Sequence, residues 1–170
     1  MGMKEIVYIE TSVVSLLVAK TSAHVAVAGN QQVTRDWWRI QQGNFLCVTS
    51  EETLVEAARG NVEQAKLRMA ALADFPLLPA STEAAQLAEQ FLLTGALPPA
   101  AKADALHLAV ATLASVDYLL TWNCRHLANA QILRRLEREA VQSGWALPKV
   151  CTPLELMGEY PYGSEGGFNS

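Results

Sequence analysis

The chain has 170 residues, of which 51% are hydrophobic, and its formal net charge is −4. This length and apolar content suit one globular domain that needs no disulfide or metal to close its core. The negative charge argues against a broadly basic surface that grips nucleic acid regardless of sequence. It still admits a phosphodiester substrate, because divalent cations held by carboxylates reverse the local charge.

The cysteines and the N-terminus bear on the compartment. Cys47, Cys124 and Cys151 are an odd number and lack C-x-x-C spacing, which favours reduced thiols in a reducing environment. The first ten residues lack the basic start and the roughly 7- to 15-residue apolar run of a signal peptide. No segment approaches the roughly 18 apolar residues of a membrane span. We therefore expect a soluble, cytoplasmic protein with no membrane partner.

Short β-rich runs alternate with helical segments along the chain. The first predicted strand, KEIVYI at residues 4–9, ends on polar residues suited to starting a helix. The further strands are predicted at NFLCVT (44–49), FPLLP (75–79), DYLLT (117–121) and residues 149–152. The further helices are predicted at 24–42, from a Thr49–Glu52 capping box to Gly60, at 62–73, from Ser81 or Thr82 to Gly95, at 101–115 and at 128–142.

This alternation predicts an α/β fold with a mainly parallel central sheet and helices on both of its faces. The last stretch, YPYGSEGGFNS, lacks an apolar period. We therefore predict one domain over residues 3–157 and a flexible C-terminal tail over residues 158–170.

Four oxygen-bearing side chains fall near predicted strand ends. Glu10 ends the first strand, and Glu56 lies in the first turns of the helix after the second strand. Asp104 lies early in the apolar helix that leads into DYLLT, and Asn123 comes just after that strand. Because ligands bind beyond the carboxyl ends of parallel strands, we expect these side chains to converge on one crevice.

Four motifs together suggest a family. They are YIETSVVSLL, VTSEETLVEAARG, KADALHLAVA and DYLLTWNCRHLANA, in this order. The chain resembles the PIN-domain proteins, which include the ribonuclease toxins of VapC type, from about Lys4 to Met157. This resemblance implies a compact three-layer fold, Mg²⁺ or Mn²⁺ held by acidic side chains, and hydrolysis of RNA phosphodiester bonds.

The resemblance also implies site residues. The family's acids fall on Glu10, Glu56 and Asp104, as catalytic and metal-binding residues, and on Asn123 as a further metal ligand. Glu10 replaces the usual aspartate, and Asn123 replaces a carboxylate with a neutral amide that removes one negative charge. We expect auxiliary roles for four neighbours, as groups that orient ligands or water or that contact the substrate: Ser12, Thr121, Arg125 and His126.

Several of these positions admit another interpretation. Glu10 could be a helix N-terminal acid stabilised by the helix dipole. Glu51 and Glu52 are rivals of Glu56 for the same role. His107, one turn beyond Asp104, could be a general base, although a core histidine bonded to the backbone is the commoner outcome.

The loop after DYLLT also admits alternatives. Trp122 could stack on a base or pack over the sheet edge. Cys124 and His126 could form a nucleophilic pair, which we disfavour because neighbours two apart do not face each other well and no orienting acid is evident. For Arg125 and His126 we prefer contact with phosphate or a role in closing a helix end.

The sequence thus predicts a metal-dependent ribonuclease, the toxin component of a toxin–antitoxin system, with RNA as substrate and an antitoxin as partner. Trp37, Trp38 and the apolar content of the first third of the chain exceed what a small domain must bury, and family members are commonly dimers, so we expect a homodimer. The alternative is a catalytically weakened PIN-like module that binds RNA or a protein. A third hypothesis is a phosphatase or small-molecule hydrolase on a similar sheet.

Overall fold

A five-stranded sheet forms the centre of the computed structural model, which describes residues 2–159. Its strands are β1 (Ile6–Ile9), β2 (Leu46–Ser50), β3 (Leu77–Leu78), β4 (Tyr118–Leu120) and β5 (Lys149–Cys151). The strand order is β3-β2-β1-β4-β5, and every strand pair among the described residues is parallel. The prediction of a mainly parallel α/β sheet is confirmed.

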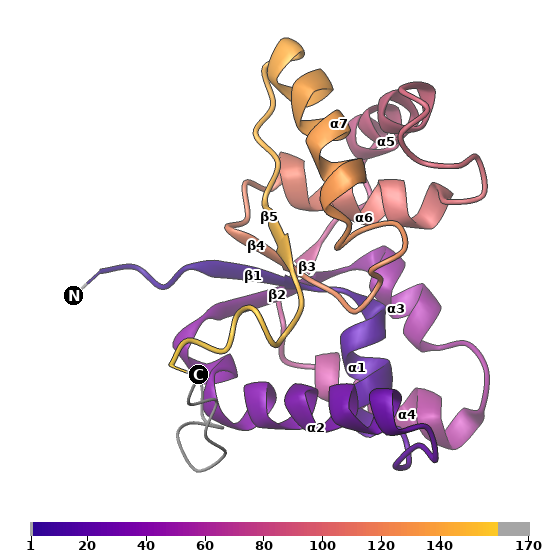
Figure 1. Ribbon diagram of the computed structural model, residues 1–170, viewed down its shortest axis with the longest axis vertical. Helices are drawn as coiled ribbons and strands as arrows, with labels where there is room; N and C mark the ends of the chain where they lie inside the picture. The colour runs from indigo at the N-terminus through magenta and orange to yellow at the C-terminus, as the bar shows by residue number, and fades with distance from the viewer. Residues whose placement is uncertain (1, 160–170) are drawn as a thin grey trace, which may run out of the picture.

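Helices cover both faces of the sheet. They are α1 (Thr11–Val18), α2 (Val25–Ile40), α3 (Glu51–Ala57), α4 (Val62–Leu72), α5 (Thr82–Leu93), α6 (Lys102–Leu113) and α7 (Ala130–Gln142), with a short 3₁₀ turn, η1 (Gln42–Asn44). Figure 1 shows α1 to α4 on one side of the sheet and α5 to α7 on the other, which makes three layers. Within residues 2–159, no helix has the length and apolar character needed to cross a membrane. Residues 160–170, most of the predicted tail, lie outside the described residues.

Strand β1 divides its side chains between two cores. Because successive strand residues point to opposite faces, Val7 and Ile9 belong to the apolar cluster on the α1 and α2 side. Tyr8 belongs to the cluster on the α5, α6 and α7 side, together with Leu108 of α6. The hydroxyl of Tyr8 is thereby held inside the protein, next to α6.

The two tryptophans of α2 pack within the domain. Trp37 is fully buried, stacks on Phe45 with ring centroids 6.0 Å apart, and donates its indole N–H to the carbonyl of Leu156 at 3.1 Å. Trp38 packs against Phe75, with centroids 5.7 Å apart. The two tryptophans therefore do not exceed the needs of the domain, and the predicted homodimer loses that part of its support.

The start of α3 differs from the predicted capping box. Ser50 caps the helix, because its Oγ accepts a hydrogen bond from the backbone N–H of Thr53 at 3.1 Å. Thr49 instead lies in β2 and donates its hydroxyl to the carbonyl of Ile9 at 3.0 Å. β2 extends one residue beyond its predicted end at Thr49, so the next hydroxyl residue, Ser50, caps α3 instead.

Candidate active site

Glu10 lies where β1 ends and α1 begins, and it is 5% exposed. Its Oε2 accepts hydrogen bonds from the backbone N–H of Ser12 at 3.1 Å, from the Ser12 hydroxyl, and from the Thr121 hydroxyl at 2.7 Å. Glu10 is therefore the N-cap of α1, as one interpretation of the sequence held. All three hydrogen bonds are to Oε2, so Glu10 can cap the helix through Oε2 and bind a metal through Oε1.

Glu56, on α3, faces α6. Its Oε1 is in direct contact with Nε2 of His107, which is 1% exposed. The ligand atoms of Glu10, Glu56 and His107 all lie within 4.8 Å of one another. Glu51, a rival in the sequence, is exposed and accepts a bond from the backbone N–H of Ala80 at 3.4 Å. Of these two acids of α3, Glu56 is the one that joins Glu10.

His107 is held from its other side by Tyr8. The Tyr8 hydroxyl lies 2.6 Å from Nδ1 of His107 and 2.6 Å from Oγ of Ser50, and 3.3 Å from Oγ1 of Thr53. Neither sequence interpretation of His107 foresaw this, since both of its ring nitrogens bond to side chains. A usable signal existed: Tyr8 lies on β1, two residues before Glu10, which directly follows that strand.

The Glu56–His107 contact is electrostatically strong. Burial alone would lower the pKa of His107, but its interactions with Tyr8, Glu56 and Glu10 raise that pKa to about 10. Burial alone would raise the pKa of Glu56, but the hydrogen bond and charge of His107 lower it below its usual value. Without a metal, the two groups form an imidazolium–carboxylate pair at neutral pH.

Asp104 and Asn123 bond to each other instead. Oδ1 of Asp104 accepts a hydrogen bond from the Asn123 side-chain amide at 2.9 Å, and Oδ2 lies 2.9 Å from Nδ1 of His126. The Asn123 Oδ1 accepts the backbone N–H of His126 at 3.0 Å. Both oxygens of Asp104 and the amide oxygen of Asn123 are thus engaged within the loop.

The four predicted acid positions therefore fall into two groups at one sheet edge. Glu10 and Glu56 meet His107, whereas Asp104 and Asn123 meet His126. Thr121 connects the groups, because its hydroxyl donates to Glu10 and accepts the backbone N–H of Asn123 at 2.9 Å. Ser12 supports the same point, with its Oγ 3.3 Å from the Thr121 hydroxyl.

The rest of the loop is placed as follows. Trp122 donates its indole N–H to the Thr34 hydroxyl at 2.7 Å and packs against the core cluster on the α1 and α2 side, so the packing alternative applies. Cys124 and Arg125 are exposed. Nδ1 of His126 contacts Asp104, which is therefore an orienting acid that the sequence did not reveal. This contact does not make Cys124 and His126 a nucleophilic pair.

A divalent cation fits the first group. Thr11, which is 9% exposed, carries the one buried side-chain polar atom within residues 2–159 that lacks a hydrogen-bond partner, its Oγ1. This hydroxyl faces Glu56 and helps to lower the pKa of that carboxyl, although their geometry falls short of a full hydrogen bond. Carboxylate oxygens beside an unsatisfied hydroxyl are a donor set that suits a hard divalent ion and its water.

Comparison with known proteins gives the fold. No protein-family model and no curated protein matches the chain in sequence. Among solved structures it is similar to a chain of VapBC2 from Rickettsia felis bound to a DNA fragment from their promoter, with a TM-score of 0.52 and 13% sequence identity. The match covers 86% of this chain and 98% of that chain. The protein therefore has the PIN fold of VapC, and the predicted fold is confirmed.

Proposed function

We propose that the protein is a divalent-metal-dependent ribonuclease that hydrolyses RNA phosphodiester bonds. The observation that carries the proposal is the Glu10–Glu56 carboxylate pair beside the unsatisfied Thr11 hydroxyl, at the carboxyl edge of the sheet of a PIN fold. Ligands of open parallel sheets bind at this edge. A surface charge run would lie exposed, whereas Glu10 is buried by its neighbours.

Each residue of the site has a proposed role. Glu10 and Glu56 would hold Mg²⁺ or Mn²⁺, which when bound lowers the pKa of a coordinated water and offsets charge on the phosphoryl oxygens. Thr121 and Ser12 fix the Glu10 carboxylate through their hydroxyls. Asp104 would join the ion only after its hydrogen bond to Asn123 opens.

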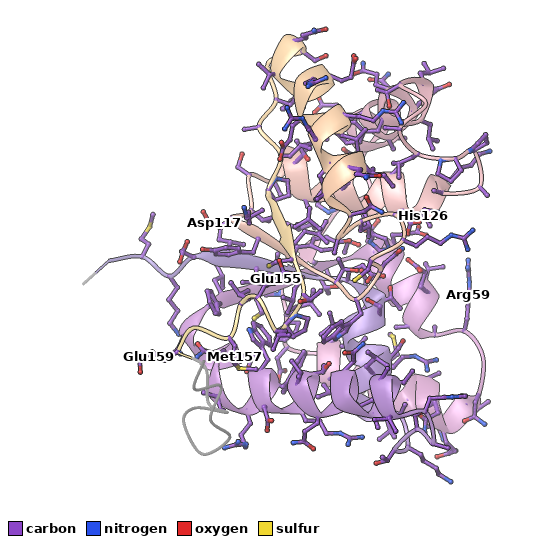
Figure 2. The ribbon with its side chains drawn as sticks, viewed as in Figure 1. Arg59, Asp117, His126, Glu155, Met157 and Glu159 are labelled. Carbon is purple, nitrogen blue, oxygen red and sulfur yellow. The ribbon has the colours of Figure 1, made fainter. Side chains whose placement is uncertain are left out.

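The substrate would meet the loop that follows β4. Arg125 is exposed and His126 is half-buried, and Asp104 fixes the imidazole of His126. Arg59 lies close enough to Glu56 to lower its pKa, and Figure 2 shows Arg59 and His126 on the same side of the molecule. Exposed cationic side chains around a carboxylate pair provide the phosphate contacts that an acidic protein otherwise lacks.

We also propose partners. By analogy with VapBC2, the protein would be the toxin of a toxin–antitoxin pair, bound by an antitoxin. A homodimer is proposed separately, from the resemblance to the PIN-domain family. Co-expression with the product of an adjacent small reading frame tests the first of these proposals, and light scattering tests the second.

One observation favours a second candidate, a catalytically weakened module that binds RNA or a protein. Asp104 and Asn123 satisfy each other, so that neither offers an unengaged oxygen to an ion in this arrangement. A site reduced to Glu10 and Glu56 would hold a metal with less charge than a site with four acids.

Cleavage of a mixed RNA pool in Mn²⁺ separates the candidates. The ribonuclease proposal expects cleavage by the parent and by Glu51→Gln, an exposed change on the same helix as Glu56. Glu10→Gln should abolish it. Retention of RNA without cleavage supports the binding module, and turnover of a generic phosphoester without RNA cleavage supports the phosphatase hypothesis.

A further inference from the structure

We propose that Nε2 of His107 is a direct ligand of the divalent cation, beside Glu10 and Glu56, and that the site therefore selects a first-row transition ion over Mg²⁺. This inference rests on the metal site of the proposed function. It adds a nitrogen ligand where the sequence motifs indicated oxygen ligands alone.

The geometry brings this nitrogen to the carboxylates. Nε2 of His107 touches Oε1 of Glu56, and both lie within 4.8 Å of a Glu10 oxygen. Two carboxylates and one imidazole thus surround a common point, from three different elements: the end of β1, α3 and α6. An ion at that point would replace the hydrogen bond between Glu56 and His107 with two metal–ligand bonds, and the proton on Nε2 would be released to solvent.

The second ring nitrogen is held as metal-binding histidines require. Such a histidine usually gives its other nitrogen to a fixed partner, which sets the tautomer and the ring orientation. Here Tyr8 lies 2.6 Å from Nδ1 and is itself fixed by Ser50 at 2.6 Å. Tyr8 is thus a positioning residue that keeps Nε2 directed at the carboxylates.

Two further observations favour His107 over Asp104 as the ligand from α6. Asp104 is not part of the cluster in which ligand atoms of Glu10, Glu56 and His107 lie within 4.8 Å of one another, and its two oxygens bond instead to Asn123 and His126 in the loop. Independently, the buried and unpartnered Thr11 hydroxyl lies next to Glu56, on the His107 side of the crevice rather than in the loop. The unsatisfied Thr11 hydroxyl therefore indicates that the ion binds in the group that contains His107.

The ligand set decides the ion. Mg²⁺ prefers six oxygen ligands in a strict octahedron and sheds water reluctantly, so that an imidazole nitrogen is a poor ligand for it. First-row transition ions accept mixed oxygen and nitrogen ligands, and their affinity rises from Mn²⁺ to Co²⁺ and beyond. We expect Mn²⁺ to bind more tightly than Mg²⁺, and Co²⁺ to bind more tightly than Mn²⁺.

Pulsed electron paramagnetic resonance of the Mn²⁺-loaded full chain tests the ligand directly. A directly bound imidazole couples its ¹⁴N nucleus to the Mn²⁺ electrons, and labelling histidine with ¹⁵N replaces that coupling. We expect the coupling in the parent and in His24→Gln, a change at an exposed histidine that caps α2. Bound Mn²⁺ without histidine coupling in the parent overturns the inference and leaves the proposed function standing.

Calorimetric titrations with Mn²⁺ and Mg²⁺ supply the second test. His107→Gln should lose the preference for Mn²⁺ and the nitrogen coupling. Tyr8→Phe, which keeps the ring and removes the hydroxyl, should weaken Mn²⁺ binding about 10-fold with a smaller effect on Mg²⁺. Equal Mn²⁺ affinity in the parent and Tyr8→Phe, or a coupling that survives in His107→Gln, contradicts the inference.

The remaining outcomes are also decisive. If His107→Gln does not fold, the parent spectrum and Tyr8→Phe decide the question. If no divalent ion binds the folded parent, both the inference and the metal-dependent function are wrong.

Discussion

The crevice has two halves that differ in burial and in bonding. The buried half consists of Glu10, Glu56, His107 and Tyr8, and the loop half consists of Asp104, Asn123 and His126. The His107 side chain is 1% exposed and the His126 side chain is 20% exposed, whereas the acids that they contact, Glu56 and Asp104, are similarly exposed at 24% and 18%. Each half contains an acid–histidine contact, Glu56 with His107 and Asp104 with His126.

This difference teaches that the same residue types perform different tasks at one sheet edge. In the buried half the histidine bridges the carboxylate to the core, through Tyr8 and Ser50. In the loop half the histidine and the asparagine bond to one aspartate and to the turn itself. In the buried half, the site residues therefore contribute to the stability of the folded protein. In the loop half, they fix the conformation of the exposed loop after β4.

The largest expected difference between the halves is in stability. His107→Ala leaves Glu56 and Tyr8 without their buried partner, and breaking such a pair costs about 3–5 kcal/mol of unfolding free energy. His126→Ala breaks a partly exposed contact and should cost about 1 kcal/mol or less. Urea denaturation of both variants measures the two values. Equal losses would remove the distinction between the halves.

The pH dependence of stability sharpens the comparison. The pKa of His107 is raised to about 10, so its stabilising contribution is fully present below the unfolded value near roughly 6.5 and is lost as pH rises through the folded value. Urea denaturation of the parent should therefore show stability falling above neutral pH, and His107→Gln should lack this fall.

The window for that measurement is set by the buried thiols. Burial raises the pKa of Cys47 to about 11 and that of Cys151 to about 12, so both act in the same direction once unfolded thiols ionise above roughly pH 8.5. Between about pH 6.5 and pH 8.5 the difference between the parent and His107→Gln belongs to His107. A parent whose stability is flat across this window contradicts the imidazolium–carboxylate pair.

A smaller effect is expected at Asn123. As a metal ligand, Asn123→Asp would tighten metal binding by adding a charge beside the ion. The structure predicts the reverse, because the change removes the amide donor to Asp104 and sets two carboxylates against each other. We expect a loss of about 1 kcal/mol in unfolding free energy and no gain in Mn²⁺ affinity. Tighter Mn²⁺ binding would support Asn123 as a ligand.

Much of the fold was predictable because it rests on local patterns. The β-rich runs ending at Glu10 and Thr121 and the Ser81 cap of α5 appear in the structure within a residue or two. The cap of α3 was misplaced from Ser50 to Thr49, since only strand pairing shows that the Thr49 hydroxyl is taken by Ile9.

The positions of the candidate site residues were predictable, whereas the way they group through hydrogen bonds was not. Strand ends and family motifs located Glu10, Glu56, Asp104 and Asn123 at one edge. They did not reveal that Asn123 turns its amide toward Asp104, because side-chain direction depends on the turn that follows it. The role of Tyr8 was missed for a related reason: a tyrosine inside an apolar strand is usually only packing.

The central claim is that Glu10 and Glu56 hold a divalent cation, and the most direct test is the Mn²⁺-dependent stability of the folded protein. An ion that binds only the folded state adds about 2.7 kcal/mol to the unfolding free energy at a hundred times its dissociation constant. We predict this gain in the parent and in Glu51→Gln, and its loss in Glu56→Gln. The same gain in all three proteins would contradict the account.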